Sequence, residues 1–158
     1  MEYRIGSGID FHQLKEGIPL IIGGVSIPSN KGSKGHSDGD VLIHAIVDAI
    51  LGSLSLGDIG KHFPSDSPHW KDTDSIIFLE HAYKLMDEKG YSIENVDATI
   101  ILQTPAISSY ILQMRENIAT VLSTDLDQIS VKATTTDKLG FIGEGEGIAA
   151  TVSALIKK

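Results

Sequence analysis

The sequence predicts an α+β fold in which one mixed β-sheet is covered on one face by helices. The 158 residues are 41% hydrophobic and 22% charged, which suits a single domain with a real core. Apolar periodicity predicts strands, helix, helix, strand, helix, strand and strand. For the fold we expect the core order β-α-β-α-β-β with an extra N-terminal hairpin. No repeat, low-complexity tract or linker divides the chain, and we expect one domain over residues 1–158.

The first strand is predicted over residues 4–12. Successive side chains of a strand leave opposite faces, so Asp10 and His12 share one face. Ile9 and Phe11 are expected to point into a core on the other face. This strand therefore offers a carboxylate and an imidazole on the same side.

The other elements follow from turn residues and apolar spacing. Two short strands around a Gly-Gly turn predict a hairpin over residues 17–28, ahead of a polar loop at 29–34. Later helices are expected where apolar residues recur every three or four positions, and strands where apolar runs are short. One of these helices begins after a cap at Asp72 or Thr73, and the other begins at Ser108 or Ser109. The strands are expected over residues 96–102, 129–133 and 148–156.

Residues 41–51 predict a buried helix, because nearly every one of them is apolar. Ser37 or Asp38 can cap its start, and Gly52 can end it. Its polar residues recur every four positions and form one stripe: Asp40, His44 and Asp48. Buried charges are costly unless they are paired or bind a metal, so this stripe needs a partner.

Two interpretations of the stripe are open. In the first, His44 is a core histidine bonded to Asp40 or Asp48, as in many structural pairs. In the second, His44 joins Asp10 and His12 as a metal ligand. Two histidines and one carboxylate are a composition typical of catalytic zinc, with an open fourth position. Asp10 and His12 alone would equally fit a solvated strand face, but beside the stripe they favour a metal.

Composition argues against several classes of protein. A net charge of −8 argues against nucleic-acid binding through a basic surface. No apolar stretch is long enough to cross a membrane, and no apolar run follows Met1 to Arg4, so we expect neither a membrane partner nor a signal peptide. Without cysteine there is no disulfide or thiolate site, and a cytoplasmic location is the default. A phosphate ester would have to be held by metals and backbone N–H groups.

Three later segments have the composition of loops. Residues 56–68 are punctuated by Gly and Pro and predict either a functional loop or a plain connector. Three threonines at 134–136 precede Asp137 at a strand end. They predict either local hydroxyl turns or a row of donors for a phosphate or base, with Asp137 as a ligand for a hard cation. Residues 143–147, Gly-Glu-Gly-Glu-Gly, predict a flexible loop.

Four ordered blocks extend over essentially the whole chain: Gly8-Ile9-Asp10-Phe11-His12, Gly35-His36-Ser37-Asp38-Gly39-Asp40 with His44, Leu56-Gly57-Asp58-Ile59-Gly60 with Phe63-Pro64, and Lys132-Ala133-Thr134-Thr135-Thr136-Asp137-Lys138-Leu139-Gly140-Phe141. At this spacing the chain resembles the 2-C-methyl-D-erythritol 2,4-cyclodiphosphate synthase family of the non-mevalonate isoprenoid pathway. Several blocks in order are far more specific than any one motif.

The resemblance implies a reaction and its cofactors. The family converts 4-diphosphocytidyl-2-C-methyl-D-erythritol 2-phosphate into a cyclic diphosphate and CMP, through attack of the 2-phosphate on the β-phosphorus. It implies Zn²⁺ on Asp10, His12 and His44, with a substrate phosphate oxygen in the fourth position. A second divalent ion, Mg²⁺ or Mn²⁺, would bridge the α- and β-phosphates on Asp137. The family forms a homotrimer with active sites between subunits.

The resemblance also implies roles for individual positions. The positions matching transition-state stabilisation are His36 and Thr135. Those matching a ribose and diphosphate loop, supplied by a neighbouring subunit, are Asp58, Ile59 and Gly60. Those matching the cytidine pocket are Leu102, Gln103, Thr104, Pro105, Ala106, Ile107, Ser108, Thr134, Thr135 and Thr136. Those matching the methylerythritol pocket are Ser37, Phe63, Pro64, Ser65, Asp66 and Ser67. Further matches to substrate-binding positions are Asp10, His12, His36, Asp137 and Phe141.

Two acidic residues of the helix lie outside these matches. We expect Asp40 and Asp48 to orient the metal ligands through hydrogen bonds. For Asp40, buried capping of the helix is an equally good interpretation.

The sequence departs from the family pattern at four positions. Asp137 stands where Glu is usual and reaches less far. Ser65, followed by Asp66, stands where Asp usually follows Phe-Pro, and Ala106 replaces a common Lys. Glu144 replaces an Arg that in the family faces a threefold channel able to bind an isoprenoid diphosphate. We therefore expect no such binding here.

Two other functions fit the same ligand set. A metal-dependent hydrolase could cleave a nucleotide diphosphate with water. A trimeric binding module could use the zinc structurally, although structural sites are usually closed by four protein ligands. The products of the reaction separate the first alternative from cyclisation.

Overall fold

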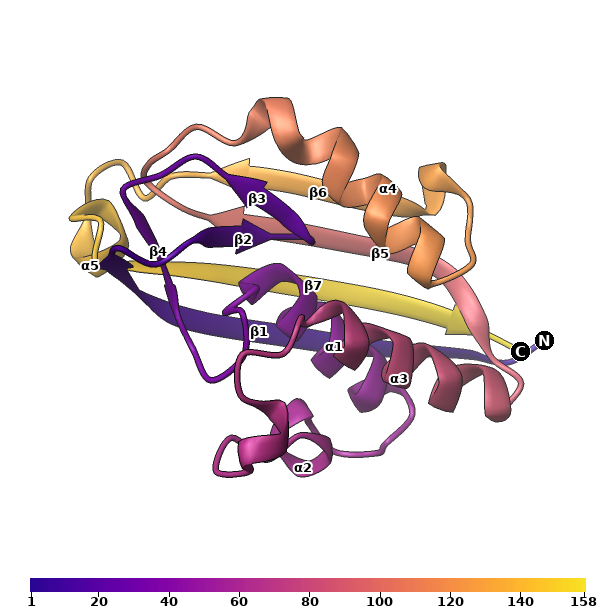
Figure 1. Cartoon of the computed structure of the whole chain (residues 1–158). Coiled ribbons are helices and arrows are strands. Elements are labelled where there is room, and N and C mark those ends of the chain that lie inside the picture. The colour runs from indigo at the N-terminus through magenta and orange to yellow at the C-terminus, as the bar shows by residue number, and fades with distance from the viewer.

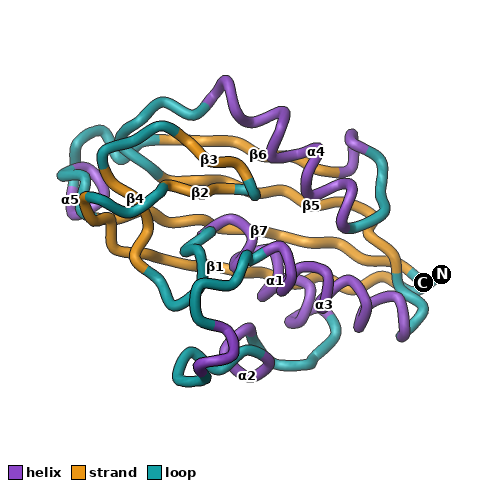
Figure 2. The backbone as a smooth tube through the Cα atoms, viewed as in Figure 1, coloured by secondary structure: helices purple, strands orange, loops and turns teal.

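A computed structural model describes residues 1–158 and contains a five-stranded mixed sheet and a separate two-stranded hairpin (Figures 1 and 2). The strands are β1 Tyr3–Glu16, β2 Leu20–Ile22, β3 Val25–Ile27, β4 Lys31–Lys34, β5 Ser92–Ile101, β6 Ile129–Thr134 and β7 Gly147–Lys157. The large sheet has the order β4-β1-β7-β5-β6, in which only β5 and β6 pair in parallel. β2 and β3 form the hairpin predicted around the Gly-Gly turn.

Helices cover one face of this sheet, as the sequence predicts. The α-helices are α1 Val41–Ser53, α2 Ile59–His62, α3 Ile76–Glu88, α4 Ile111–Val121 and α5 Gly140–Gly143. In Figure 1 α1, α3 and α4 lie on the same side of the sheet, with α1 over β1 and β7. Short 3₁₀ turns add Pro68–Trp70, Ser108–Tyr110 and Leu126–Gln128. No helix combines the length and apolar character needed to cross a membrane.

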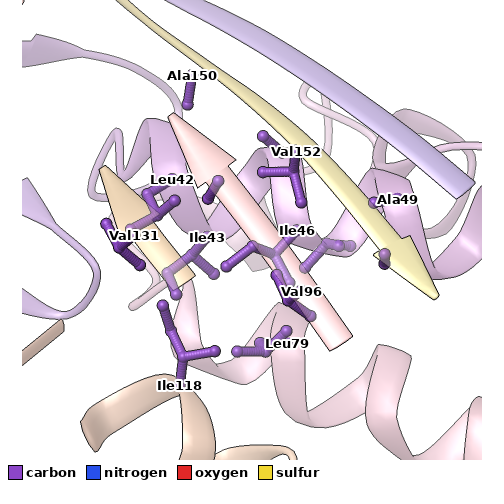
Figure 3. Close-up of a cluster of buried hydrophobic side chains, with 14 of the residues drawn as sticks. Leu42, Ile43, Ile46, Ala49, Leu79, Val96, Ile118, Val131, Ala150 and Val152 are labelled. Carbon is purple, nitrogen blue, oxygen red and sulfur yellow. The ribbon is translucent and has the colours of Figure 1, made fainter. Parts of the chain in front are cut away.

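The core lies between α1 and the sheet. Figure 3 shows apolar side chains of α1 meeting residues of the strands and of α3 and α4, among them Ile43, Ile46, Leu79, Val96, Ile118 and Val152. The helix also lies unusually close to β1, because Gly6 and Gly8 face it. A Cβ atom on either glycine would stand 1.9 Å from a helix carbonyl oxygen, that of Ala49 or Ala45. This close approach brings His44, in the middle of the polar stripe, against Asp10 and His12 of β1.

The opposite face of the sheet is open. Ile9 and Phe11 are 60% and 53% exposed on that face, so the prediction that they point into a core is wrong. The alternation along β1 is as predicted, but the glycines place the helix on the face that also carries Asp10 and His12. The apolar residues of β1 are thus presented outward.

Several local predictions about the connecting segments also differ from the structure. The loop expected at 29–34 contains β4, which pairs with the end of β1 that extends beyond β7. The helix expected after Asp72 or Thr73 begins later, with Ser75 at the N-cap position. The segment 56–68, expected to be a loop, contains the short helix α2.

The N-cap of α1 is Asp40, so the prediction of Ser37 or Asp38 is wrong. The Asp40 carboxylate accepts from the backbone N–H of Ile43 at 3.0 Å. Gly52 does not end the helix, which continues to Ser53. The Asp38 carboxylate instead accepts from Ser75 at the start of α3 and from the Asp40 N–H.

Candidate active site

The side chains of Asp10, His12 and His44 converge where α1 crosses β1. Asp10 Oδ2 lies 2.8 Å from His12 Nε2 and 3.2 Å from His44 Nδ1. The two histidine nitrogens are themselves 3.2 Å apart. One potential ligand atom from each residue thus lies within 4.8 Å of the others. The predicted two-histidine, one-carboxylate cluster is present in the fold.

Hydrogen bonding indicates that this cluster suits a cation. His12 Nδ1 lies 2.9 Å from the carbonyl oxygen of Lys34, which can only accept, so Nδ1 carries the proton and Nε2 presents its lone pair. Burial disfavours the charge on Asp10, but its close contacts with the His12 and His44 ring nitrogens outweigh this effect and lower the pKa of Asp10 to about 2. A carboxylate that stays ionised beside imidazole lone pairs is a donor set that zinc accepts.

The second nitrogen of His44 has its own partners. Nε2 lies 2.8 Å from the Ser75 hydroxyl oxygen and 3.0 Å from that of Ser37. Ser75 is fully buried and bonds in turn to Asp38. Ser75 was not predicted from the sequence. Its only signal there is its place ahead of an amphipathic helix, which is also typical of a simple N-cap.

Neither of the other two acidic side chains in the stripe bonds to the His44 ring. Asp40 accepts from the backbone N–H groups of Gly23 and Gly24, at 2.9 and 2.8 Å, in addition to capping α1. Asp48 accepts from the Ile59 N–H at 2.7 Å. The expectation that Asp40 and Asp48 orient the metal ligands is therefore wrong, as is the pairing of His44 with either of them. The capping interpretation of Asp40 is confirmed.

A cavity of about 190 Å³ opens beside the cluster. It is lined by two of the three cluster residues, by predicted site residues and by two aromatic side chains that were not predicted: His12, His36, Ser37, His44, Ile59, Gly60, Phe63, Ser65, Trp70 and Phe78. The Trp70 ring meets Phe63 edge-on, with centroids 5.0 Å apart, and Phe63 packs 4.3 Å from Phe78. The cavity therefore has a polar side, which carries two of the candidate metal ligands, and an aromatic wall.

The loop that carries Asp58 and Gly60 belongs to this cavity within one chain. Gly60 lines it together with His12 and His44. The bond from Ile59 to Asp48 anchors the loop to the helix that carries His44. The expectation that a neighbouring subunit supplies this loop to these metal ligands is therefore wrong.

A second group of predicted residues gathers where β5 and β6 end. Parallel pairing places Ile101 beside Thr134, and the Leu102 N–H donates to the Thr134 carbonyl at 3.0 Å. The predicted cytidine-pocket segments 102–108 and 134–136 thereby lie side by side. Leu102 and Ile107 are only 4% exposed, so their side chains belong to the core. Asp137 is exposed in this group, at a φ of 53°, and is not part of the metal cluster.

Comparison with known proteins identifies the family. The YgbB family profile matches residues 3–157. The chain belongs to the YgbB family. Proteins named 2-C-methyl-D-erythritol 2,4-cyclodiphosphate synthase from Chlorobium phaeobacteroides and Bacillus subtilis are 55% and 54% identical to it, over 98% and 99% of both chains. The resemblance stated from the four sequence blocks is thus confirmed.

Solved structures of similar chains support the same YgbB fold. A structure described as "IspF (Plasmodium falciparum) CDP complex" has a TM-score of 0.86 and 44% identity, covering 98% of this chain and 95% of that one. The bifunctional IspDF from Campylobacter jejuni has a TM-score of 0.95 and 43% identity, covering 99% of this chain. This chain spans only 42% of that bifunctional protein.

The four positions that depart from the usual family pattern lie in different places of this YgbB chain. Ser65 lines the cavity beside the metal cluster. Ala106 and Asp137 are exposed in the second group. Glu144 lines a larger cleft of about 600 Å³, together with Lys31, Thr104 and Pro105. The ring of Phe141, a predicted substrate-binding residue, lies 6.4 Å from that of Phe11 between centroids.

Proposed function

We propose that this chain is a 2-C-methyl-D-erythritol 2,4-cyclodiphosphate synthase, with one catalytic domain over residues 1–158. The observation that carries the proposal is the convergence of Asp10, His12 and His44 beside an aromatic-walled cavity. It is supported by more than 50% identity to proteins named for this activity. The activity makes the chain a lyase of isoprenoid precursor biosynthesis.

The reaction needs positioning more than it needs a protein nucleophile. An oxygen of the substrate 2-phosphate attacks the β-phosphorus, and the bond from that phosphorus to the oxygen bridging the α-phosphate breaks. CMP leaves with the bridging oxygen, and the new phosphorus–oxygen bond closes the ring. Because the attack is intramolecular, holding the two ends together removes much of the entropic barrier. The chain must also neutralise charge on three phosphates.

We assign the metal roles to four residues. Asp10, His12 and His44 would hold Zn²⁺ with three protein ligands and an open position. When bound, the zinc would act as a Lewis acid on a substrate phosphate oxygen. Asp137 would hold a second divalent cation, Mg²⁺ or Mn²⁺, for which a carboxylate oxygen is a suitable ligand. Its exposed carboxylate is free of any side-chain partner in the chain.

We assign transition-state stabilisation to His36 and Thr135. His36 Nε2 donates to the Ser67 carbonyl at 2.8 Å, which holds the ring at the cavity rim. Thr135 Oγ1 accepts from the Asp137 N–H at 3.2 Å, so its hydroxyl hydrogen is available to a phosphate. Thr135 can therefore donate to charge that develops on phosphorus oxygens, whereas His36 would do so from Nδ1 in its imidazolium form.

The substrate would lie across both groups of residues. Ser37 and the segment 63–67 would hold the methylerythritol unit against the aromatic wall, and Asp58, Ile59 and Gly60 would face the ribose and diphosphate. The segments 102–108 and 134–136 would hold the cytosine. The described CDP complex of the Plasmodium falciparum protein supports a CDP-linked substrate.

A homotrimer would bring the two groups together. The open face of the sheet exposes Ile5, Ile9 and Phe11, at 73%, 60% and 53%. An apolar face of this kind is typical of an interface. We propose that three copies bury this face, so that the cytidine group of one subunit completes the metal cavity of the next.

A product assay tests the proposal. Purified protein is mixed with 4-diphosphocytidyl-2-C-methyl-D-erythritol 2-phosphate, Zn²⁺ and Mg²⁺, and ³¹P NMR follows the products. We expect equal amounts of CMP and cyclic diphosphate, lost in His44→Ala and retained in His69→Ala, whose exposed ring lies outside the cavity lining. CMP with an uncyclised bisphosphate would instead indicate a hydrolase. Zinc binding without turnover would favour a binding module.

A further inference from the structure

We propose that Asp38 and Ser75 form a hydrogen-bonded relay that fixes the tautomer of His44 and so presents its Nδ1 lone pair to the metal. Both would be positioning residues, because neither lies among the three metal ligands. The inference rests on the proposed zinc role of Asp10, His12 and His44. It assigns to Asp38 and Ser75 the orienting role that the sequence suggested for Asp40 and Asp48.

The relay begins at a carboxylate held on both oxygens. One oxygen of Asp38 accepts from the Ser75 backbone N–H at 3.0 Å. The other accepts from the Ser75 hydroxyl and from the Asp40 N–H, the latter at 3.0 Å. Asp38 is therefore fixed in place between the start of α1 and the start of α3.

The direction of each bond follows from the chemistry of the groups. An ionised carboxylate can only accept, so the Ser75 hydroxyl must donate its hydrogen to Asp38. The Ser75 oxygen then has only lone pairs to offer to His44 Nε2, which lies 2.8 Å away. Nε2 must therefore carry the proton. The lone pair of His44 is left on Nδ1, the atom that faces Asp10 Oδ2 and His12 Nε2 at 3.2 Å.

Two further observations support a dedicated role for Ser75. It stands at the N-cap position of α3, yet its side chain makes no capping hydrogen bond. A serine at this position usually caps the helix with its side chain, and here the hydroxyl bonds to His44 and Asp38 instead. Ser75 is also fully buried, so water cannot replace its bonds.

Ser37 cannot perform the same task alone. Its hydroxyl lies 3.0 Å from His44 Nε2, but no carboxylate bonds to it, so it can either donate or accept. His12 has no need of a relay, since a backbone carbonyl already fixes its Nδ1 proton. The two histidines thus present different nitrogens to the cation. Only the tautomer of His44 depends on side chains, those of Ser75 and Asp38, which mutation can remove. Partners of this kind typically change metal affinity roughly 10- to 100-fold when they are mutated.

The first experiment reads the tautomer without any mutation. Long-range ¹H–¹⁵N correlation spectra of the metal-free full-length protein, recorded at about pH 8 where an ordinary histidine is neutral, distinguish the two tautomers of His44. We expect the proton on Nε2. A proton on Nδ1 would overturn the inference. Because this reading involves no metal, it stands apart from any failure of the zinc assignment or of the synthase activity.

The second experiment removes the relay. In Asp38→Asn the amide can donate to Ser75, which frees the Ser75 hydroxyl to donate to Nε2; in Ser75→Ala only Ser37 remains. We expect both variants to populate the other tautomer and to bind Zn²⁺ roughly 10- to 100-fold more weakly in chelator competition. Matched controls are Asp74→Asn, an exposed neighbour, and Ser53→Ala, a buried hydroxyl bonded only to the Ile50 carbonyl. The controls should retain wild-type affinity.

Two results of the second experiment would count against the relay. Wild-type tautomer and zinc affinity in both relay variants would refute it. Equal loss of affinity in Ser53→Ala would show that any buried serine truncation disturbs the site, and would refute it as well.

Discussion

Replacing Gly8 with alanine should separate β1 from α1 and disrupt the metal cluster. The new Cβ atom would stand 1.9 Å from the carbonyl oxygen of Ala45, whereas ordinary contact begins at 3.4 Å. The two backbones would therefore have to move apart by about 1.5 Å, which is the difference between 3.4 Å and 1.9 Å. Asp10 lies two residues after Gly8 on β1, and His44 lies directly before Ala45 on α1. Their present separation of 3.2 Å could not survive a shift of that size.

The variant should lose both stability and zinc affinity. Overpacking a tightly packed core typically costs about 1–3 kcal/mol, and here the obstacle is rigid backbone, which places the expected cost at or above the upper end. Denaturant unfolding of the metal-free protein measures the first loss, and chelator competition measures the second.

Gly52→Ala is the matched control for this prediction. It lies on α1, but its added Cβ would meet only the Ser7 carbonyl oxygen at 3.9 Å, an ordinary contact. Alanine in a helix is favoured over glycine by about 1 kcal/mol, so this variant should be at least as stable as wild type and should bind zinc normally. Normal stability and zinc affinity in Gly8→Ala would refute the idea that close backbone approach builds the site.

Three further predictions concern other parts of the fold. Asp48→Ala leaves the Ile59 N–H without its acceptor and should raise KM roughly tenfold in steady-state assays, with a smaller change in kcat. An unchanged KM would exclude the role of Asp48 in anchoring the Asp58–Gly60 loop to α1. Burial raises the pKa of Asp40 to about 6 despite its N–H donors, so between about pH 4 and 6 the folded chain holds a proton that the unfolded chain has released. Ionisation of Asp40 should therefore lower the unfolding free energy by up to about 3 kcal/mol as pH rises through this range, and Asp40→Asn should lack this pH dependence. An unfolding free energy that rises with pH instead would show that the N–H donors dominate over burial. Ile9→Arg on the open face should convert the proposed trimer to monomers in sedimentation experiments, whereas Ile77→Arg, at an exposed position on α3, should not.

The metal cluster could be predicted because it depends on local spacing. Two residues two apart on a strand share a face, and a buried helix with one polar stripe needs a partner for it. Asp10, His12 and His44 satisfy both conditions. The hairpin around the Gly-Gly turn was predictable for the same reason, since its signal lies within a few residues.

The features that could not be predicted depend on contacts distant in sequence. Alternation along β1 predicts two faces, but it does not tell which face the helix covers. The exposed face carries the apolar residues Ile9 and Phe11, which are also typical of a core face. Asp38 and Asp40 are equally good capping residues by sequence. The difference between them arises from Ser75, whose place beside His44 depends on packing between α3 and α1.

The origin of oxygen in the products tests the synthase assignment most directly. The reaction is run to completion in ¹⁸O-labelled water, and the masses of CMP and of the second product are measured. Intramolecular attack uses only substrate oxygens, so we predict a cyclic diphosphate and CMP that both lack ¹⁸O. An uncyclised bisphosphate carrying one ¹⁸O would mean that water attacks the phosphorus, and would contradict the assignment.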